Sequence, residues 1–131
     1  PNEIQKSITP KTTAILPVHF GGFPCNLKDI QNIADKHNLT IIEDAAHAFG
    51  SKHNNHFIGN VADITCFSFY ATKNLTTGEG GMLTGDPEFI EQAATNYQTV
   101  TGLQAVIYVC KASDGAEISY SSSDSTDELS L

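Results

Sequence analysis

The chain lacks arginine and carries few positive charges. Its seven basic residues are all lysines, and fifteen acidic residues leave a net charge of −8 at pH 7. Proteins that bind nucleic acids neutralise phosphates with lysine and arginine, so this charge balance argues against a nucleic acid partner. With 131 residues, the chain has room for one small domain.

Cysteine is also scarce, and long apolar runs are absent. The three cysteines are far apart and form no CxxC pair: Cys25, Cys66 and Cys110. An odd number at this spacing argues against a disulfide framework or a metal site and suits a reducing compartment, so we expect a cytoplasmic protein. No apolar stretch approaches the roughly 20 residues that a membrane-spanning helix needs, so we expect no membrane association.

Strand and helix patterns alternate along most of the chain. Continuous apolar runs predict buried strands, helical spacing of apolar residues predicts helices, and a polar stretch over 51–59 predicts a turn or hairpin. This order predicts an α/β fold with a mainly parallel sheet. The expected strands are 13–19, 40–43, 64–69 and 81–84. The expected helices are 27–37 capped by Asn26, a short one over 45–49, and one from Pro87 to about Tyr97 with Phe89, Ile90 and Ala93 facing inward.

Two polar residues stand where predicted strands end. Asp44 closes one strand and Ser68 closes the next. Ligands of α/β sheets bind beyond the carboxyl ends of the strands. A carboxylate there can keep the ring nitrogen of pyridoxal phosphate (PLP) protonated, and a serine hydroxyl can bind its phosphate. The alternatives are a turn-capping aspartate and a serine bonded to the backbone.

Lys73 follows Ser68 and precedes a glycine-rich turn at 78–81. It is the only charged residue between Ile64 and Thr77. A lysine held in a cleft gives up its proton more readily and then attacks an aldehyde such as that of PLP. The alternative is a surface lysine in a loop. His47 lies three residues after Asp44, where it either contacts the cofactor ring or is simply packed.

Together these motifs resemble the DegT/DnrJ/EryC1/StrS sugar aminotransferases, which are PLP-dependent enzymes of the aspartate aminotransferase fold, fold type I. The resemblance runs from about Ser7 to about Tyr97. It includes ITPKTTAILPVH at 8–19, IEDAAHAFG at 42–50, CFSF at 66–69 and KNLTTGEGGM at 73–82.

The resemblance implies a partial three-layer α/β/α large domain with PLP as cofactor. It implies transfer of an amino group, from glutamate, to a keto-sugar nucleotide. Lys73 is then the catalytic residue that bonds to the cofactor and moves the proton, and the cofactor-binding residues are Asp44, His47, Ser68 and Lys73. Full-length relatives are expected to be homodimers.

The chain also departs from that family. Full-length members are several times longer and carry an earlier phosphate-binding segment and a smaller C-terminal domain. We therefore expect a fragment, with residues 1–98 forming part of the PLP-binding large domain and 99–131 a divergent segment. From about residue 112 that segment is acidic and rich in serine, and we expect disorder. The isolated chain is expected to be inactive, and the alternative function is a truncated remnant or scaffold.

A metal-dependent hydrolase is the remaining alternative. It would use Asp44 and His47 together with other histidines. The histidine spacings form no ligand set, so we expect no metal.

Overall fold

The computed structural model describes residues 1–104. The expected disordered tail from about residue 112 lies outside this range. In chain order the elements are α1 (Asn2–Ser7), β1 (Ala14–Ile15), a 3-10 turn η1 (Phe20–Gly22), α2 (Leu27–His37), β2 (Thr40–Asp44), β3 (Lys52–His53), β4 (His56–Phe57), β5 (Ile64–Ser68), β6 (Gly81–Gly85) and α3 (Pro87–Thr101).

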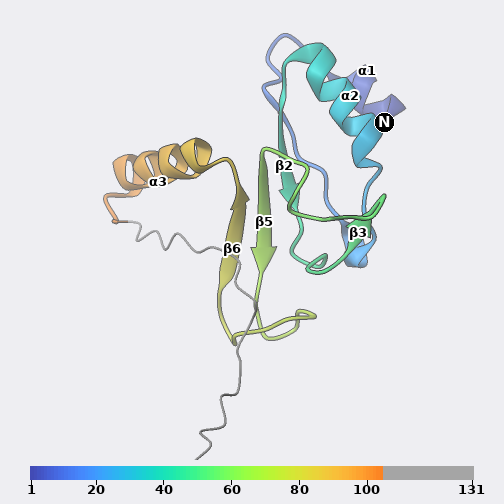
Figure 1. Ribbon diagram of the computed structural model, residues 1–131. Helices are drawn as coiled ribbons and strands as arrows, with labels where there is room; N and C mark the ends of the chain where they lie inside the picture. Colours follow the sequence, from blue (N-terminus) through green and yellow to red (C-terminus); the bar gives the residue numbers. More distant parts are fainter. Residues whose placement is uncertain (105–131) are drawn as a thin grey trace, which may run out of the picture.

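The main sheet has the strand order β1-β2-β5-β6. The first three strands are parallel, and β6 runs antiparallel to β5. An isolated bridge between Val18 and Asp44 continues the β1–β2 pairing past the end of β1. Figure 1 shows the arrowheads of β2 and β5 pointing to the same edge of the sheet. The prediction of an α/β fold with a mainly parallel sheet is confirmed.

Helix α2 covers one face of this sheet. Asn26 caps its first turn, because the Asn26 side-chain oxygen accepts a 3.3 Å hydrogen bond from the Asp29 amide. The helix ends at Asn38 in the left-handed conformation, with φ 52°. Alternate residues of the strands meet the apolar stripe of the helix, since side chains alternate between the two faces of a strand. The resulting buried cluster contains Ile15, Ile30, Ile33, Ala34 and Ile41.

The opposite face of the sheet is open among residues 1–104. Strand register places one row of side chains across it, namely Val18, Asp44, Cys66 and Leu83. The two apolar ends of this row, Val18 and Leu83, are each 47% exposed. Leu16, one rung away on the same face, is 60% exposed. Asp44 therefore lies on the open face, away from α2.

Two expectations about helices are wrong. Residues 45–49 form turns, because the Ala45 amide donates to the Cys66 carbonyl and the Ala46 amide to the Asp44 carboxylate. Helix α3 extends to Thr101 and fully buries no residue within the described range: Phe89 and Ala93 are exposed, and Ile90 is half-buried. It leaves the sheet after β6 (Figure 1), and no second element covers its apolar side among residues 1–104.

The hairpin at 51–59 was predicted from the sequence, whereas helix α1 was not. The polar stretch at 51–59 is confirmed as a hairpin, in which β3 pairs antiparallel with β4. Asn54 and Asn55 form its turn with φ of 50° and 66°, the left-handed values that a tight hairpin turn requires. Helix α1 was not predicted, since six residues carry too little periodicity to reveal a helix.

Candidate functional site

Asp44 is held by its backbone at the carboxyl end of β2. Its amide donates a 2.9 Å hydrogen bond to the Pro17 carbonyl, and its own carbonyl accepts a 3.0 Å bond from the His19 amide. Its half-buried carboxylate accepts a 3.1 Å bond from the Ala46 amide at one oxygen. Among residues 1–104 the other carboxylate oxygen has no hydrogen-bond donor, so it remains available to a ligand.

Ser68 ends the neighbouring strand on the same face. It lies one rung beyond Cys66, which is the register partner of Asp44. The Ser68 hydroxyl oxygen accepts a long 3.4 Å bond from the Tyr70 amide. Its proton is not used in that bond, so the hydroxyl can still donate to an anionic group.

Lys73 lies in the loop between β5 and β6. The Asn74 amide group donates a 2.8 Å bond to the Phe49 carbonyl, which ties this loop to the segment that follows Asp44. The Phe49 ring also packs edge-on against Phe69, with 5.6 Å between ring centroids. Lys73 itself is half-buried, and its ammonium makes no hydrogen bond or ion pair with any residue in the range 1–104.

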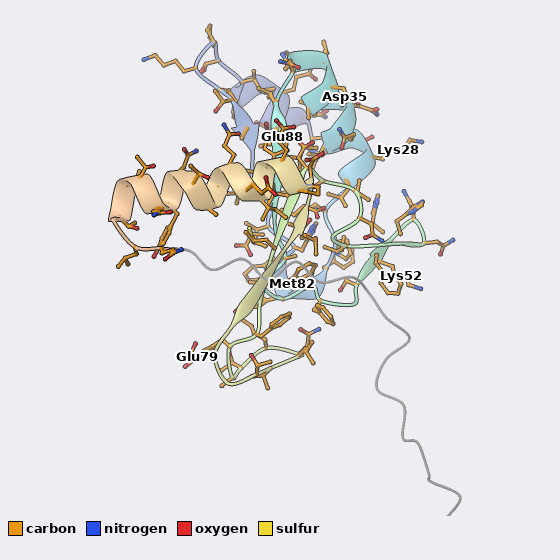
Figure 2. All side chains as sticks on the ribbon, turned by 60° about the vertical axis from the view of Figure 1, so that its left-hand side comes forward. Lys28, Asp35, Lys52, Glu79, Met82 and Glu88 are labelled. Atoms are coloured by element: carbon orange, nitrogen blue, oxygen red, sulfur yellow. The ribbon has the colours of Figure 1, made fainter. Side chains whose placement is uncertain are left out.

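The same loop is stabilised by its own hydroxyl groups. Thr76 donates a 3.0 Å bond to the Phe69 carbonyl and accepts a 2.9 Å bond from the Gly78 amide. Figure 2 shows Glu79 at the far end of this loop, below Met82 of β6. The loop thus extends from the edge at which β2 and β5 end (Figure 1).

His47 lies at this edge, and its side chain is exposed. Its carbonyl oxygen lies against Gly22, where a β-carbon would approach it to 2.8 Å. Gly22 also has φ +81°, so glycine is required there both by conformation and by space. The Ser51 hydroxyl donates a 2.9 Å bond to the Gly22 carbonyl, which joins η1 to the segment after β2.

The structure therefore brings the four predicted residues to one edge of the sheet. Asp44 and Ser68 lie on one face of adjacent strands, while Lys73 and His47 lie in two loops joined through Asn74. Two open hollows of about 360 and 410 Å³ lie elsewhere, beside α1 and near the end of α2. Within residues 1–104 the candidate site is an open edge of the sheet.

Two cysteines are close to acidic residues in this region. Burial raises the pKa of the Cys66 thiol, and the negative charge of Asp44 raises it further. Burial also raises the pKa of Cys25, with an added contribution from Glu43. Both thiols are free, and within residues 1–104 no group of three or more histidine, cysteine or carboxylate side chains could hold a metal ion.

Sequence reasoning missed a buried polar cluster under α2. It consists of His19, Glu43 and Thr65, each at most 1% exposed. The available signal was Glu43, an acid on the side of β2 that alternation assigns to the core.

The model of the DegT/DnrJ/EryC1/StrS aminotransferase family matches residues 1–112. The chain belongs to this family. The matched range extends beyond Tyr97, where the motifs recognised in the sequence end.

Several curated proteins that the chain resembles have names that refer to sugars. The spore coat polysaccharide biosynthesis protein SpsC of Bacillus subtilis is 51% identical over 88 residues, which are 67% of this chain and 23% of that protein. The GDP-perosamine synthase of Escherichia coli O157:H7 is 48% identical over 82 residues, 63% of this chain and 22% of that protein. The chain thus spans about a quarter of the length of the relatives it matches.

Solved structures of sugar aminotransferases share the fold. DesV of Streptomyces venezuelae, in complex with a ketimine intermediate, is 43% identical with a TM-score of 0.65, covering 72% of this chain and 26% of that one. Spr1654 of Streptococcus pneumoniae in its PLP form is 30% identical with a TM-score of 0.64, covering 76% and 30%. The large-domain architecture is that of PLP fold-type I aminotransferases.

Every helix within residues 1–104 falls short of what crossing a membrane would require in length or in apolar character.

Proposed function

We propose that this chain is part of the cofactor-binding domain of a PLP-dependent sugar aminotransferase. The full enzyme would transfer an amino group, from glutamate, to a keto-sugar nucleotide. The observation that carries the proposal is the meeting of Asp44, Ser68 and the Lys73 loop at the carboxyl edge of β2 and β5. Family membership and the PLP form of a structural neighbour support it.

The residues present fit PLP, because each has a polar group left for it. Asp44 has a carboxylate oxygen without a donor, Ser68 has an unused hydroxyl proton, and the Lys73 ammonium has no partner among residues 1–104. When bound, PLP supplies an aldehyde that accepts an amine and a ring that takes up the electron pair released at the substrate carbon.

Each residue then has one role in our proposal. The Asp44 carboxylate holds a proton at the ring nitrogen, and the Ser68 hydroxyl donates to the phosphate. His47 lies near the cofactor ring. Lys73 is the covalent point of attachment, and its amine afterwards carries the proton to and from the substrate carbon.

Reductive trapping tests the proposal. The chain is mixed with PLP, reduced with borohydride and digested, and the modified peptide is mapped by mass spectrometry. We expect about one pyridoxyl group per chain on Lys73, because its loop lies at the proposed site whereas Lys52 points away on the hairpin (Figure 2).

Two variants sharpen this test. Lys73→Ala should lose the label, whereas Lys52→Ala should keep it. Label scattered over surface lysines would contradict the named attachment site. Complete absence of label would favour the other candidate function, a remnant or scaffold of the fold.

We also propose a cytoplasmic location and, for the full-length enzyme, a homodimer. The location rests on the two free cysteines and the absence of a CxxC pair. Recovery of the protein from the membrane or extracellular fraction of the source cell would contradict it. Sedimentation of the full-length enzyme as a monomer would contradict the homodimer.

A further inference from the structure

The polar cluster under α2 has no part in the proposed chemistry, yet it is almost fully buried. His19 is 1% exposed, and Glu43 and Thr65 are 0% exposed. We call these three residues the buried triad. They lie on the face of the sheet covered by α2, whereas Asp44 lies on the open face, since neighbouring residues of a strand point in opposite directions.

The contacts within the triad determine where its protons lie. The Thr65 hydroxyl donates to one carboxylate oxygen of Glu43. His19 Nδ1 accepts a 3.0 Å bond from the Cys25 amide. Because that nitrogen is an acceptor, the ring proton is on Nε2, which lies 3.4 Å from the second carboxylate oxygen of Glu43.

Within residues 1–104, neither His19 Nε2 nor Glu43 Oε1 has another hydrogen-bond partner. His19 Nε2 and Glu43 Oε1 are both buried without a hydrogen bond at standard geometry. A buried carboxylate is costly, and a well-packed apolar group in its place is often equally stable or more so. The triad is therefore better explained by a requirement for position than by a gain in stability.

The triad joins β2 and β5 to the segment that follows β1, at the level of Asp44. Glu43 precedes Asp44 and is the register partner of Thr65 on β5. On the other side, the His19 amide donates to the Asp44 carbonyl, and the Pro17 carbonyl accepts from the Asp44 amide. Movement of Glu43 relative to His19 would thus displace both backbone bonds of Asp44.

We propose that the buried triad is a positioning device for Asp44. Its side-chain contacts hold the end of β2 between the β1 extension and β5, so that the Asp44 carboxylate keeps one orientation on the open face. His19, Glu43 and Thr65 are positioning residues that touch no ligand. The inference rests on the proposed function only in that Asp44 is taken as the partner of the cofactor ring.

Hydrogen exchange tests the triad without cofactor. Thr65→Val removes only the hydroxyl that Glu43 accepts from, and Glu43→Ala removes the carboxylate. In both variants the amides of His19 and Asp44 should exchange about tenfold faster, which corresponds to about 1.4 kcal/mol, while amides in the middle of α2 change by less than about twofold.

Two further variants provide the controls. In Glu43→Gln the amides of His19 and Asp44 should still exchange slowly, because the glutamine side chain can accept from His19 and donate to the Thr65 oxygen. Thr84→Val removes a hydroxyl on the same face that donates a 3.0 Å bond to the Gly59 carbonyl, so His19 and Asp44 should be unaffected. Unchanged exchange at these two amides, or equal acceleration throughout α2, would overturn the proposal.

PLP affinity provides the second measurement. Followed by absorbance, the dissociation constant should rise about tenfold in Thr65→Val and stay unchanged in Thr84→Val. Equal affinity in both variants would show that the triad does not position Asp44 for the ring. Failure of the unmodified chain to bind PLP would overturn the proposed function instead, and hydrogen exchange would still decide whether the triad holds Asp44.

Discussion

Two adjacent acids at the end of β2 have different surroundings and different roles. Glu43 is fully buried against Thr65 and His19, whereas Asp44 is half-buried on the open face. Alternation along the strand separates them, although they are neighbours in the sequence. Each acid also faces its own cysteine, Glu43 facing Cys25 and Asp44 facing Cys66.

This pairing predicts that removing one acid changes the reactivity of its own cysteine and not that of the other. Burial and then the neighbouring acid raise the pKa of each thiol, so both hold less reactive thiolate than free cysteine at pH 8. Glu43→Gln removes one charge and should lower the pKa of Cys25, which accelerates its alkylation by roughly two- to fivefold. Asp44→Asn should do the same for Cys66. The measurement is the iodoacetamide rate at each cysteine by mass spectrometry.

Each variant is the control for the other. Cys66 should keep its rate in Glu43→Gln, and Cys25 should keep its rate in Asp44→Asn. Because the thiolate is the reactive form, both rates should rise with pH until each thiol is titrated. Equal acceleration of both cysteines in one variant would indicate local unfolding and contradict the electrostatic explanation.

At the scale of elements, α2 and α3 are contrasting helices. Both begin with a side-chain cap, Asn26 for α2 and Asp86 for α3. Helix α2 buries four residues, while α3 buries none within the described range. Capping therefore accounts for where each helix starts, but only α2 has a tertiary partner that makes it part of the core.

This contrast predicts that shortening an apolar side chain to alanine lowers the free energy of unfolding more in α2 than in α3. Ile30 of α2 is 3% exposed, so Ile30→Ala should lower the free energy of unfolding by about 2–5 kcal/mol through lost burial and a cavity. Ile90 of α3 is only half-buried, and Ile90→Ala should cost about 1 kcal/mol or less. Urea denaturation followed by circular dichroism measures both. Equal losses of stability in the two variants would mean that α3 packs against other parts of the protein in addition to β6.

On the scale of the whole molecule, the sheet has one covered face and one face that is open among the residues that the structure describes. The open face displays Leu16, Val18 and Leu83, which are between 47% and 60% exposed. Large apolar side chains this exposed on one sheet face are typical of a surface that binds another apolar group.

The open face predicts binding of a hydrophobic dye. The fluorescence of anilinonaphthalene sulfonate should increase with the unmodified chain and fall by about half or more in the double variant Leu16→Ser, Leu83→Ser. Leu103→Ser is the matched control, because Leu103 is 61% exposed but lies beyond α3 and not on the sheet. A loss of fluorescence as large in Leu103→Ser would contradict binding at the open face.

Much of this protein could be predicted from its sequence, because the signals are local. Helix α2 follows from its cap and its apolar spacing, and β2 and β5 follow from continuous apolar runs that end at Asp44 and Ser68. The hairpin at 52–57 follows from its central asparagines, which readily adopt left-handed backbone angles. The family follows from motifs in order along the chain.

Other features depended on contacts between distant segments. Residues 45–49 turn instead of forming a helix because Ala45 bonds to β5. Within residues 1–104, α3 has no core to face because it leaves the sheet after β6. The triad joins residues 19, 43 and 65, which are far apart in sequence and have no shared motif. The amino-acid sequence by itself determined the local elements, the family and the residues with the right chemistry. Only the tertiary structure decided which of two adjacent acids is buried and which is open to a ligand, because strand pairing and helix placement give the two faces of the sheet different surroundings.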